Sequence, residues 1–418
     1  MVTDEFFSLA QSESQNRGMA DLPLVKVPHP VGSIALDRLR SLAELTVDAI
    51  AEQLLRNSKF AAGATAINRT NGDDSDSLIM VSSEPAELFN EMIERGWSDG
   101  LPVLPPTGAA VEIMVAASGL DKHFSLGAMP PLNGRAVIEK LAANAVMAGC
   151  LPEYFPLVVA ATKGVLLPGF NLDSVQTTTG NVAPMIIVNG PCRHRLKINS
   201  GANVLGQGWR ANATIGRFVQ LVKRNIGGSY PGTTCKATLG WPGKYSICVG
   251  ENEEASPWEP LHVERGFKAE QSTVTAISAD ASIRASDLDS SKAEGILINF
   301  AQKMDGPSGP EAIMVICPEH AKIIAGDGFS KKDVQKFIWE RAAYRMKDLP
   351  DETFEQRVKR RSDLKLTRDS VIPVTDRPED ILVIVAGGDG SQSQYIHVWG
   401  QSTPEGGSTR SVTKVIRD

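Results

Sequence analysis

The first 57 residues predict a single helix–strand–helix unit, and this unit constrains the fold most. Apolar residues recur with helical spacing over 5–17 and 34–55. Between them, the short apolar run 22–27 ends at Pro28-His29-Pro30, as a strand would. Helix, strand, helix is the repeating order of a doubly wound sheet, but one strand and two helices cannot enclose a core. We therefore expect an incomplete N-terminal α/β unit at 1–57, which needs strands from another segment or chain.

Composition excludes several classes of protein. The chain has 418 residues, 42% hydrophobic and 22% charged, which is typical of globular domains. The formal net charge of -6 leaves no basic field to hold a polyanion, so no nucleic acid partner is expected. No apolar stretch reaches the roughly 20 residues of a membrane span, and no signal-peptide pattern opens the chain. We expect a cytoplasmic protein with no membrane partner.

Beyond the N-terminal unit, the chain divides into a connector and a main domain. Residues 58–83 mix Asn, Gly, Ser and Asp without periodicity, which indicates a flexible linker. The main α/β domain is expected over 84–418. Helical spacing predicts its helices over 84–95, 108–118, 135–147, 153–165, 211–225 and from Ser330 onward.

Fully apolar runs of strand length alternate with these helices. They lie at 185–188, 312–317 and 381–386, and Pro318 follows the second at a predicted helix start. No repeat of solenoid period is present. The sequence therefore predicts a layered α/β fold with a mixed or mostly parallel sheet.

Two parts of the sequence resemble a known family. The stretch VTDEFFSLAQSESQNRGMADLPLVKVPHPVGSI resembles the C-terminal part of the UGSC-type domain, a small bacterial domain named for a motif of selenocysteine or cysteine with Gly, Ser and Cys. From about Glu84 onward, stretches such as GWSDGLPVLPPT and PEHAKIIAGDGFSKKDV resemble the larger uncharacterised region found with such domains. The redox motif itself would lie upstream of Met1. The resemblance therefore implies a UGSC-motif partner chain as a possible source of a thiol or selenol.

The densest candidate for ligand binding is the Gly-rich stretch NSGANVLGQGWR, which precedes the helix predicted over 211–225. Glycines before a helix let backbone N–H groups converge, and the helix N-terminus adds about half a positive charge. One interpretation is a site for a carboxylate, phosphate or other small anion, positioned by Arg210, Asn212 and Thr214. The other is a Gly-rich turn capped by its own side chains, because no full phosphate-loop or dinucleotide signature is present.

A second candidate is the acidic, Pro-interrupted stretch ENEEASPWEPLHVERG, in which carboxylates, an imidazole and a guanidinium lie close in sequence. Clustered carboxylates raise at least one pKa toward neutrality, as general acid–base catalysis requires. We expect catalytic roles for Glu251, Glu254, His262 and Glu264, with His262 as the proton carrier and Arg265 as a substrate clamp. The alternatives are a hard-metal site, which we do not assign, and a solvated acidic loop.

The remaining candidates are one thiol and one glycine-rich turn. Five cysteines without a CxxC pair argue against a disulfide framework and a structural zinc site. Cys192 follows a buried strand and precedes Arg193, His194 and Arg195, which would favour its thiolate, so it is the best nucleophile candidate. Cys317 is expected to pack in a strand or loop. Ser391 lies in GGDGS after the last apolar run, where it could complete an anion pocket or close a tight turn.

Together these residues lead to two functional hypotheses. The first is an enzyme that acts on a small polar or anionic molecule, by acid–base or thiol-assisted bond cleavage or addition. A lyase, a hydrolase and a thiol-dependent oxidoreductase are not distinguished, and no cofactor is indicated. The second is a non-catalytic subunit that binds and stabilises a UGSC-type redox partner. In either case the chain could assemble with such a partner or with copies of itself.

Overall fold

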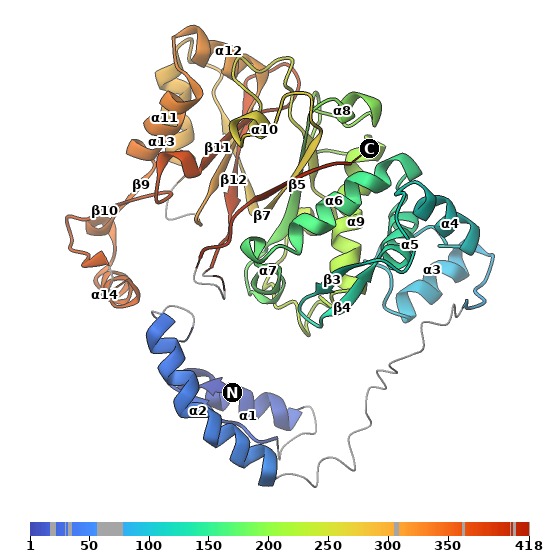
Figure 1. Ribbon diagram of the computed structural model, residues 1–418. Coiled ribbons are helices and arrows are strands. Elements are labelled where there is room, and N and C mark those ends of the chain that lie inside the picture. The colour runs from blue at the N-terminus through green and yellow to red at the C-terminus, as the bar shows by residue number, and fades with distance from the viewer. Residues whose placement is uncertain are drawn as a thin grey trace. The chain divides into compact units, whose positions relative to one another are not determined.

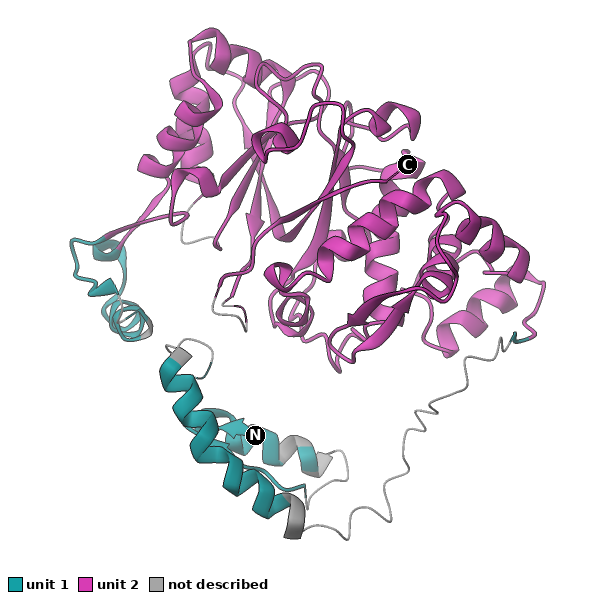
Figure 2. Ribbon diagram, in the orientation of Figure 1, with its two compact units in different colours: residues 1–79, 346–370 teal, residues 80–345, 371–418 magenta. Residues whose placement is uncertain are grey.

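The computed structural model describes residues 1–16, 22–29, 31, 36–56, 78–304, 309–361, 364–401, 403 and 407–417. Helices and a mixed, curled sheet confirm the predicted α/β class. The chain forms two compact units, coloured separately in Figure 2. Unit 1 comprises residues 1–79 and 346–370, and unit 2 comprises residues 80–345 and 371–418. Most of the predicted linker at 58–83 lies outside the described residues.

Unit 1 contains the predicted helix–strand–helix order. Its strands are very short. The strand expected at 22–27 contains only two residues, which pair in parallel with two residues at the N-terminus. Its elements are β1 (Val2–Thr3), η1 (Asp4–Phe6), α1 (Phe7–Asn16), β2 (Lys26–Val27), α2 (Leu36–Arg56), η6 (Met346–Asp348) and α14 (Asp351–Arg360).

Unit 2 contains the main sheet and its covering helices. The helices are α3 (Pro85–Glu94), α4 (Gly108–Ala116), α5 (Ile138–Ala148), η3 (Pro152–Tyr154), α6 (Phe155–Val165), η4 (Pro168–Phe170), α7 (Leu172–Thr177), α8 (Cys192–Arg195), α9 (Arg210–Asn225), η5 (Pro242–Lys244), α10 (Leu261–Glu264), α11 (Ala293–Lys303), α12 (Pro318–Gly326), α13 (Lys331–Arg341) and η8 (Pro378–Asp380). The strands are β3 (Ser125–Met129), β4 (Gly134–Val137), β5 (Ala183–Asn189), β6 (Cys248–Gly250), β7 (Thr273–Ser286), β8 (Ala312–Ile316), β9 (Ala343–Arg345), β10 (Val371–Pro373), β11 (Ile381–Val385), β12 (Gln392–Val398) and β13 (Val412–Val415).

The main sheet repeats one arrangement twice. Its strand order is β11-β8-β12-β7-β5-β6, with β13 also paired to β7. β5 runs parallel to β6 and antiparallel to β7, and β8 runs parallel to β11 and antiparallel to β12. The two central strands, β7 and β12, are antiparallel to each other, so the order is symmetric about them. Asn189, which ends β5, and Cys317, which follows β8, therefore occupy equivalent positions.

The sheet curls so that the C-terminal ends of its two edge strands, β6 and β11, come together. The N–H of Asn252, two residues after β6, donates to the carbonyl of Val385 at the end of β11, over 2.7 Å. Alternate residues of the strands point into the curl and form an apolar core there, to which Ile187, Val249, Ile277, Val315 and Ile384 belong. Because the interior is filled by these side chains, the strand ends are the part of the sheet where polar side chains can gather.

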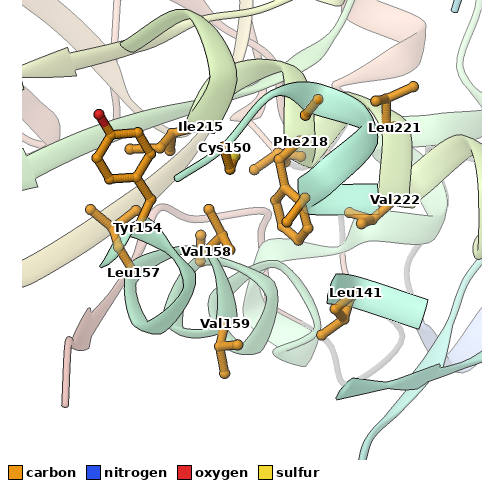
Figure 3. Close-up of a cluster of buried hydrophobic side chains, with 14 of the residues drawn as sticks. Leu141, Cys150, Tyr154, Leu157, Val158, Val159, Ile215, Phe218, Leu221 and Val222 are labelled. Atoms are coloured by element: carbon orange, nitrogen blue, oxygen red, sulfur yellow. The ribbon is translucent and has the colours of Figure 1, made fainter. Parts of the chain in front are cut away.

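Helices cover the outer face of the sheet in two groups (Figure 1). α5, α6 and α9 pack over the half that contains β5 and β6, and α11, α12 and α13 pack over the half that contains β8 and β11. The amphipathic pattern predicted for α9 is confirmed, because Ile215, Phe218, Val219 and Val222 are buried. Figure 3 shows Phe218 among side chains of α5 and α6, in the core that this helix group shares.

Membrane-spanning potential is confined to one bent helix pair. In the part of the chain that the structure describes, no single helix is long and apolar enough to cross a bilayer. The segments Pro152–Val165 and Pro168–Thr177 pass the same test only when they are taken together, across a bend of 74°.

Candidate active site

Three loops that are distant in sequence meet where the sheet closes. The N–H of Gly250 donates to the carbonyl of Asn199 over 3.0 Å, which connects the Gly-rich stretch to the end of β6. The N–H of Gly387 donates to the carbonyl of Ser200 over 2.9 Å, which adds the GGDGS turn after β11. The two Gly-rich loops and the acidic stretch therefore adjoin through their backbones.

Glu251 is the buried acid of this region. It follows β6 directly, and its side chain has no exposed surface. Its Oε2 accepts hydrogen bonds from Asn189 Nδ2 over 2.6 Å and from the N–H of Leu261 over 2.9 Å, but Oε1 has no partner. Burial raises the pKa of Glu251 to about 7, and the charge of Lys331 and these hydrogen bonds oppose the rise. This carboxyl group therefore has the pKa of a general acid–base group at neutral pH.

Arg193 holds two further carboxylates beside Glu251. Its side chain is 3% exposed, and its Nη1 donates to the carbonyl of Glu251 over 2.7 Å. Its guanidinium binds both carboxylate oxygens of Glu254, over 3.1 and 2.9 Å, and lies 3.1 Å from Glu253 Oε2. Chiefly because of the Arg193 hydrogen bonds, the pKa of Glu254 falls to about 2, and His194 adds a contact of 2.9 Å. Glu254 is thus an ionised partner of arginine and not a proton carrier at neutral pH.

A glycine lets the chain turn from β5 into the helix that carries Arg193. Gly190 has φ +83°, and a Cβ built on it would lie 2.3 Å from the carbonyl oxygen of Gln271. Its N–H donates to Glu253 Oε1 over 2.7 Å. Only glycine adopts this conformation and leaves that space, so the backbone at residue 190 fixes Arg193 and Glu253 on the same side of β5.

His262 is also buried next to these carboxylates. It lies in the short helix α10, and its side chain has no exposed surface. Its Nδ1 is 4.0 Å from Glu253 Oε1 and has no hydrogen-bond partner, while Nε2 lies 3.4 Å from the carbonyl of Ala269. One ring nitrogen of His262 therefore has no hydrogen-bond partner among the described residues.

Unpartnered polar atoms concentrate around this group. Among the described residues, eleven buried side-chain polar atoms have no partner, and five of them belong to this one region. They are Asn189 Oδ1, Arg193 Nε, Glu251 Oε1, His262 Nδ1 and Thr273 Oγ1. Thr273 joins the group because it pairs with Asn189 across β5 and β7. Buried polar groups are nearly always hydrogen-bonded, so five such atoms in one place mark a cluster of hydrogen-bonding groups that the described protein contacts leave unsatisfied.

The residues predicted for anion binding at α9 are used by the protein itself. Arg210 donates to the carbonyl of Gly149 over 3.2 and 3.1 Å. Asn212 is 4% exposed and binds both backbone groups of Asn199, while Thr214 donates to the carbonyl of Arg210 over 2.8 Å. These contacts correspond to the capped-turn alternative, and no hydrogen bond given for the described residues joins them to His262.

The other predicted residues form ion pairs or hydrogen bonds with residues outside this group. Glu264 accepts from Lys331 over 2.8 Å and from Gln335 over 3.1 Å, which fixes α10 against α13. Arg265 donates to hydroxyl groups of Thr413 and Ser411 and lies 3.6 Å from Glu311. Ser391 donates to Glu319 over 3.0 Å.

Cys192 lies beside the acid group, and two of its three basic neighbours contact a carboxylate. Its Sγ is 3.8 Å from the carbonyl of Asn189, and its N–H donates to Ser272 over 2.9 Å. The neighbouring Arg193 and His194 are both paired to Glu254. The Glu254 carboxylate offsets part of the positive field that was expected to favour a thiolate at Cys192.

Sequence reasoning missed Asn189, Glu253 and Thr273, and treated Arg193 only as a neighbour of Cys192. A polar residue that ends a fully apolar strand, as Asn189 does, was the available signal. Within the described residues, no group of three His, Cys, Asp or Glu side chains could hold a metal ion. An open hollow of about 500 Å³ lies elsewhere, among Lys292, Glu294, Asp327, Phe329 and Phe337.

Comparison with protein families gives one result. Residues 1–56 match the UGSC family. The UGSC-like segment thus coincides with the predicted incomplete unit, and the match ends before the main sheet. A comparison with curated proteins gave no match.

Proposed function

We propose that unit 2 is an enzyme that binds a small polar molecule at the end of β5 and β6 and acts on it by acid–base chemistry. The five unpartnered atoms around Glu251 carry this proposal. They comprise hydrogen-bond acceptors and donors, so together they could hold a molecule that bears hydroxyl, amide or carbonyl groups. The reaction would be a bond cleavage or an addition.

Glu251 is the proton carrier in this proposal. A pKa of about 7 lets it exist in both protonation states near neutral pH, which is the condition for efficient general acid–base catalysis. His262 Nδ1 would be the second proton-exchanging atom. Asn189 and Thr273 would orient the bound molecule, and Arg193 would hold the carboxylates in place.

Charge favours a neutral polar ligand over an anion. Glu251, Glu253 and Glu254 contribute carboxylates, and the buried guanidinium of Arg193 is paired with two of them. An added anion would meet the remaining carboxylate in a region of low dielectric, where like charges repel strongly. We therefore narrow the expected substrate class from polar or anionic to polar and uncharged.

The Glu251→Gln variant tests the protonation of this group. Because the pKa of Glu251 is raised in the folded state, from 4.5 to about 7, the native protein binds more protons than the unfolded chain between these values. Ionisation of Glu251 therefore does not affect the free energy of unfolding below about pH 4.5, and it lowers that free energy by about 3 kcal/mol above about pH 7. We expect the variant to match the wild type near pH 4 and to exceed it by up to about 3 kcal/mol at about pH 8, measured by urea unfolding.

A matched control and a ligand pair complete this experiment. Glu294→Gln, at an exposed position, should leave the pH profile unchanged. Lactamide and lactate have nearly the same shape, but lactamide is neutral and has an NH2 donor where lactate has a carboxylate oxygen. Their binding to the full chain, followed by ligand-observed NMR, therefore separates neutral from anionic recognition. Lactamide should bind with an affinity that changes near pH 7 in the wild type and not in Glu251→Gln. Binding of lactate alone, or identical pH profiles in both proteins, would contradict the proposal.

A second candidate function is favoured by unit 1. A parallel pair of two-residue strands is far too small to be stable alone, and Leu45 and Val47 of α2 are 81% and 58% exposed. We propose that this UGSC-like unit joins a UGSC-type chain, which would make the protein a binding and stabilising subunit of that chain.

The exposed leucine offers a test of this association. Leu45→Glu in the full chain should weaken a complex with a UGSC-motif protein by at least about tenfold, because it would place a charge in an apolar contact. Leu239→Glu is the matched control, since Leu239 is 89% exposed and lies in unit 2. Native mass spectrometry measures the complex. Equal complex formation by both variants would count against the subunit hypothesis.

A further inference from the structure

A second group of reactive side chains lies in the other half of the duplicated sheet. Cys317 follows β8 and precedes α12, His320 lies in the first turn of that helix, and Ser393 is on β12. Each of the three side chains is 1% exposed. The group is independent of Glu251, and sequence reasoning assigned Cys317 only a packing role.

Ser393 connects the thiol to the imidazole. Its Oγ lies 2.8 Å from His320 Nδ1 and 3.4 Å from Cys317 Sγ. The same oxygen accepts from the N–H of Cys317 over 3.0 Å, so the hydroxyl is held by three contacts. His320 Nε2 lies 3.0 Å from the carbonyl of Asp287, which can only accept. That carbonyl fixes a proton on Nε2, and Nδ1 is therefore the nitrogen that exchanges one with Ser393.

This geometry supports proton transfer in one direction. When the thiol ionises, its proton can pass to Ser393 Oγ while the Ser393 proton passes to His320 Nδ1. The resulting imidazolium donates to Ser393, and Ser393 donates to the thiolate. In accord with this exchange, hydrogen bonds lower the pKa of Cys317 and raise that of His320, in each case against the effect of burial. The first turn of α12 adds a favourable dipole for a thiolate.

Two of the other thiols, Cys150 and Cys248, differ in this respect. Burial raises the pKa of Cys150 to about 12, and it raises the pKa of Cys248 as well. Cys150 donates to the carbonyl of Thr214, and neither thiol has a histidine partner among its given contacts. The chain thus contains its own reference thiols for a comparison of reactivity.

An exposed hydrogen bond joins the two segments that carry this group. Ser391 lies two residues before Ser393, and it donates to Glu319, two residues after Cys317. Gly387 and Gly390 flank the turn, with φ of +112° and +122°.

We propose that Cys317 is the nucleophile of a second reactive centre, activated by His320 through Ser393, which takes small uncharged carbon electrophiles such as an activated acyl group. The thiol proton moves through Ser393 to His320 as Sγ attacks the carbonyl carbon. The bond to the leaving group then breaks, and His320 returns the proton to that group. The products are a thioester on Cys317 and the protonated leaving group, so no oxidant or reductant is needed.

Competitive alkylation of the native full chain by iodoacetamide tests this centre. Peptide mapping by mass spectrometry should show carbamidomethylation of Cys317 at least about tenfold faster than of Cys150 or Cys248, with a rate that levels off below the ordinary thiol pKa of about 8.5. Ser393→Ala and His320→Gln should each slow the labelling of Cys317 at least about tenfold. Ser278→Ala, at a buried serine of β7 outside the group, should leave it unchanged.

The wild-type rate profile keeps the proposal falsifiable even where a variant folds poorly. Equal labelling of all five thiols in a variant indicates that its chain is unfolded. For such a variant, the pH dependence of Cys317 labelling in the wild type is the deciding measurement. Faster labelling of Cys150, Cys192 or Cys248 in the native protein would overturn the proposal. A Cys317 rate that is unchanged in folded Ser393→Ala would also overturn it. None of these outcomes depends on the role of Glu251.

Discussion

Arg193→Met is expected to destabilise unit 2 by about 3–5 kcal/mol, because it removes one partner of a buried ion-pair network. Methionine fills a similar volume, but it cannot donate to the carbonyl of Glu251 or to the carboxylates of Glu253 and Glu254. Glu253 is 14% exposed and would lose its counter-ion in a poorly solvated place, whereas the half-exposed Glu254 could turn to water. Most of the loss therefore comes from Glu253 and from the orphaned carbonyl.

Urea unfolding at neutral pH measures this effect, and Arg284→Met is the matched control. Arg284 lies on β7 of the same sheet and is exposed, so its replacement should change the free energy of unfolding by no more than about 0.5 kcal/mol. Similar losses for both variants would mean that the buried network contributes little. The pH profile adds a second readout, because the Glu254 carboxylate, with its pKa lowered to about 2, should no longer resist protonation once Arg193 is absent.

Phe218→Ala is expected to cost about 3–5 kcal/mol, through the cavity it would leave in the core shared by α5, α6 and α9. Phe218 has no exposed surface, and Figure 3 shows it between Leu141 and the side chains around Val158. All of the helices around it are anchored on the same face of the sheet, so the space cannot collapse without moving one of them.

Phe124→Ala makes the same chemical change at a side chain that is 49% exposed. It should cost less than about 1 kcal/mol, since most of its ring already contacts water. Chemical denaturation of both variants gives the comparison. If Phe218→Ala were no more damaging than Phe124→Ala, the packing between these helices would have to be looser than described.

Local patterns were sufficient to predict most helices and three strands of the main sheet, β5, β8 and β11. Ser330 and Asp333 form the capping box that opens α13, and the apolar stripe of α9 is buried as its spacing requires. Runs of β-branched residues likewise marked β5, β8 and β11. In all of these elements the residues that determine the structure are close in sequence.

The central strands were missed because their residues do not look like those of a buried strand. β7 reads TVTAISADASIRAS, with Ala and Ser at many positions where larger apolar residues would be expected. It is a strand because it has partners on both sides, β5 and β12, and these pairings join residues far apart in the sequence. A pattern read along one segment contains no information about such partners.

The candidate site shows the same limit. Glu251 and His262 were identified because they lie in one acidic stretch, whereas their contacts with Asn189 and Thr273 depend on how the strands pair. Arg210 was misleading for the same reason, since the carbonyl that it binds is on Gly149, at the end of another helix. Residue types indicated which groups could react, and only the pairing of strands decided which of them meet.

The doubled strand arrangement also places two different groups of ionisable side chains at equivalent strand ends of one sheet. Asn189 and Cys317 occupy equivalent positions, but carboxylic acids lie beside Asn189 at the end of β5, whereas a thiol follows β8. A substitution at the end of β5 can therefore leave the residues after β8 unaffected, and the reverse also holds, as long as β7 and β12 keep their pairing. A substitution that disrupts β7 or β12, by contrast, would displace both groups at once, because these two strands lie between β5 and β8.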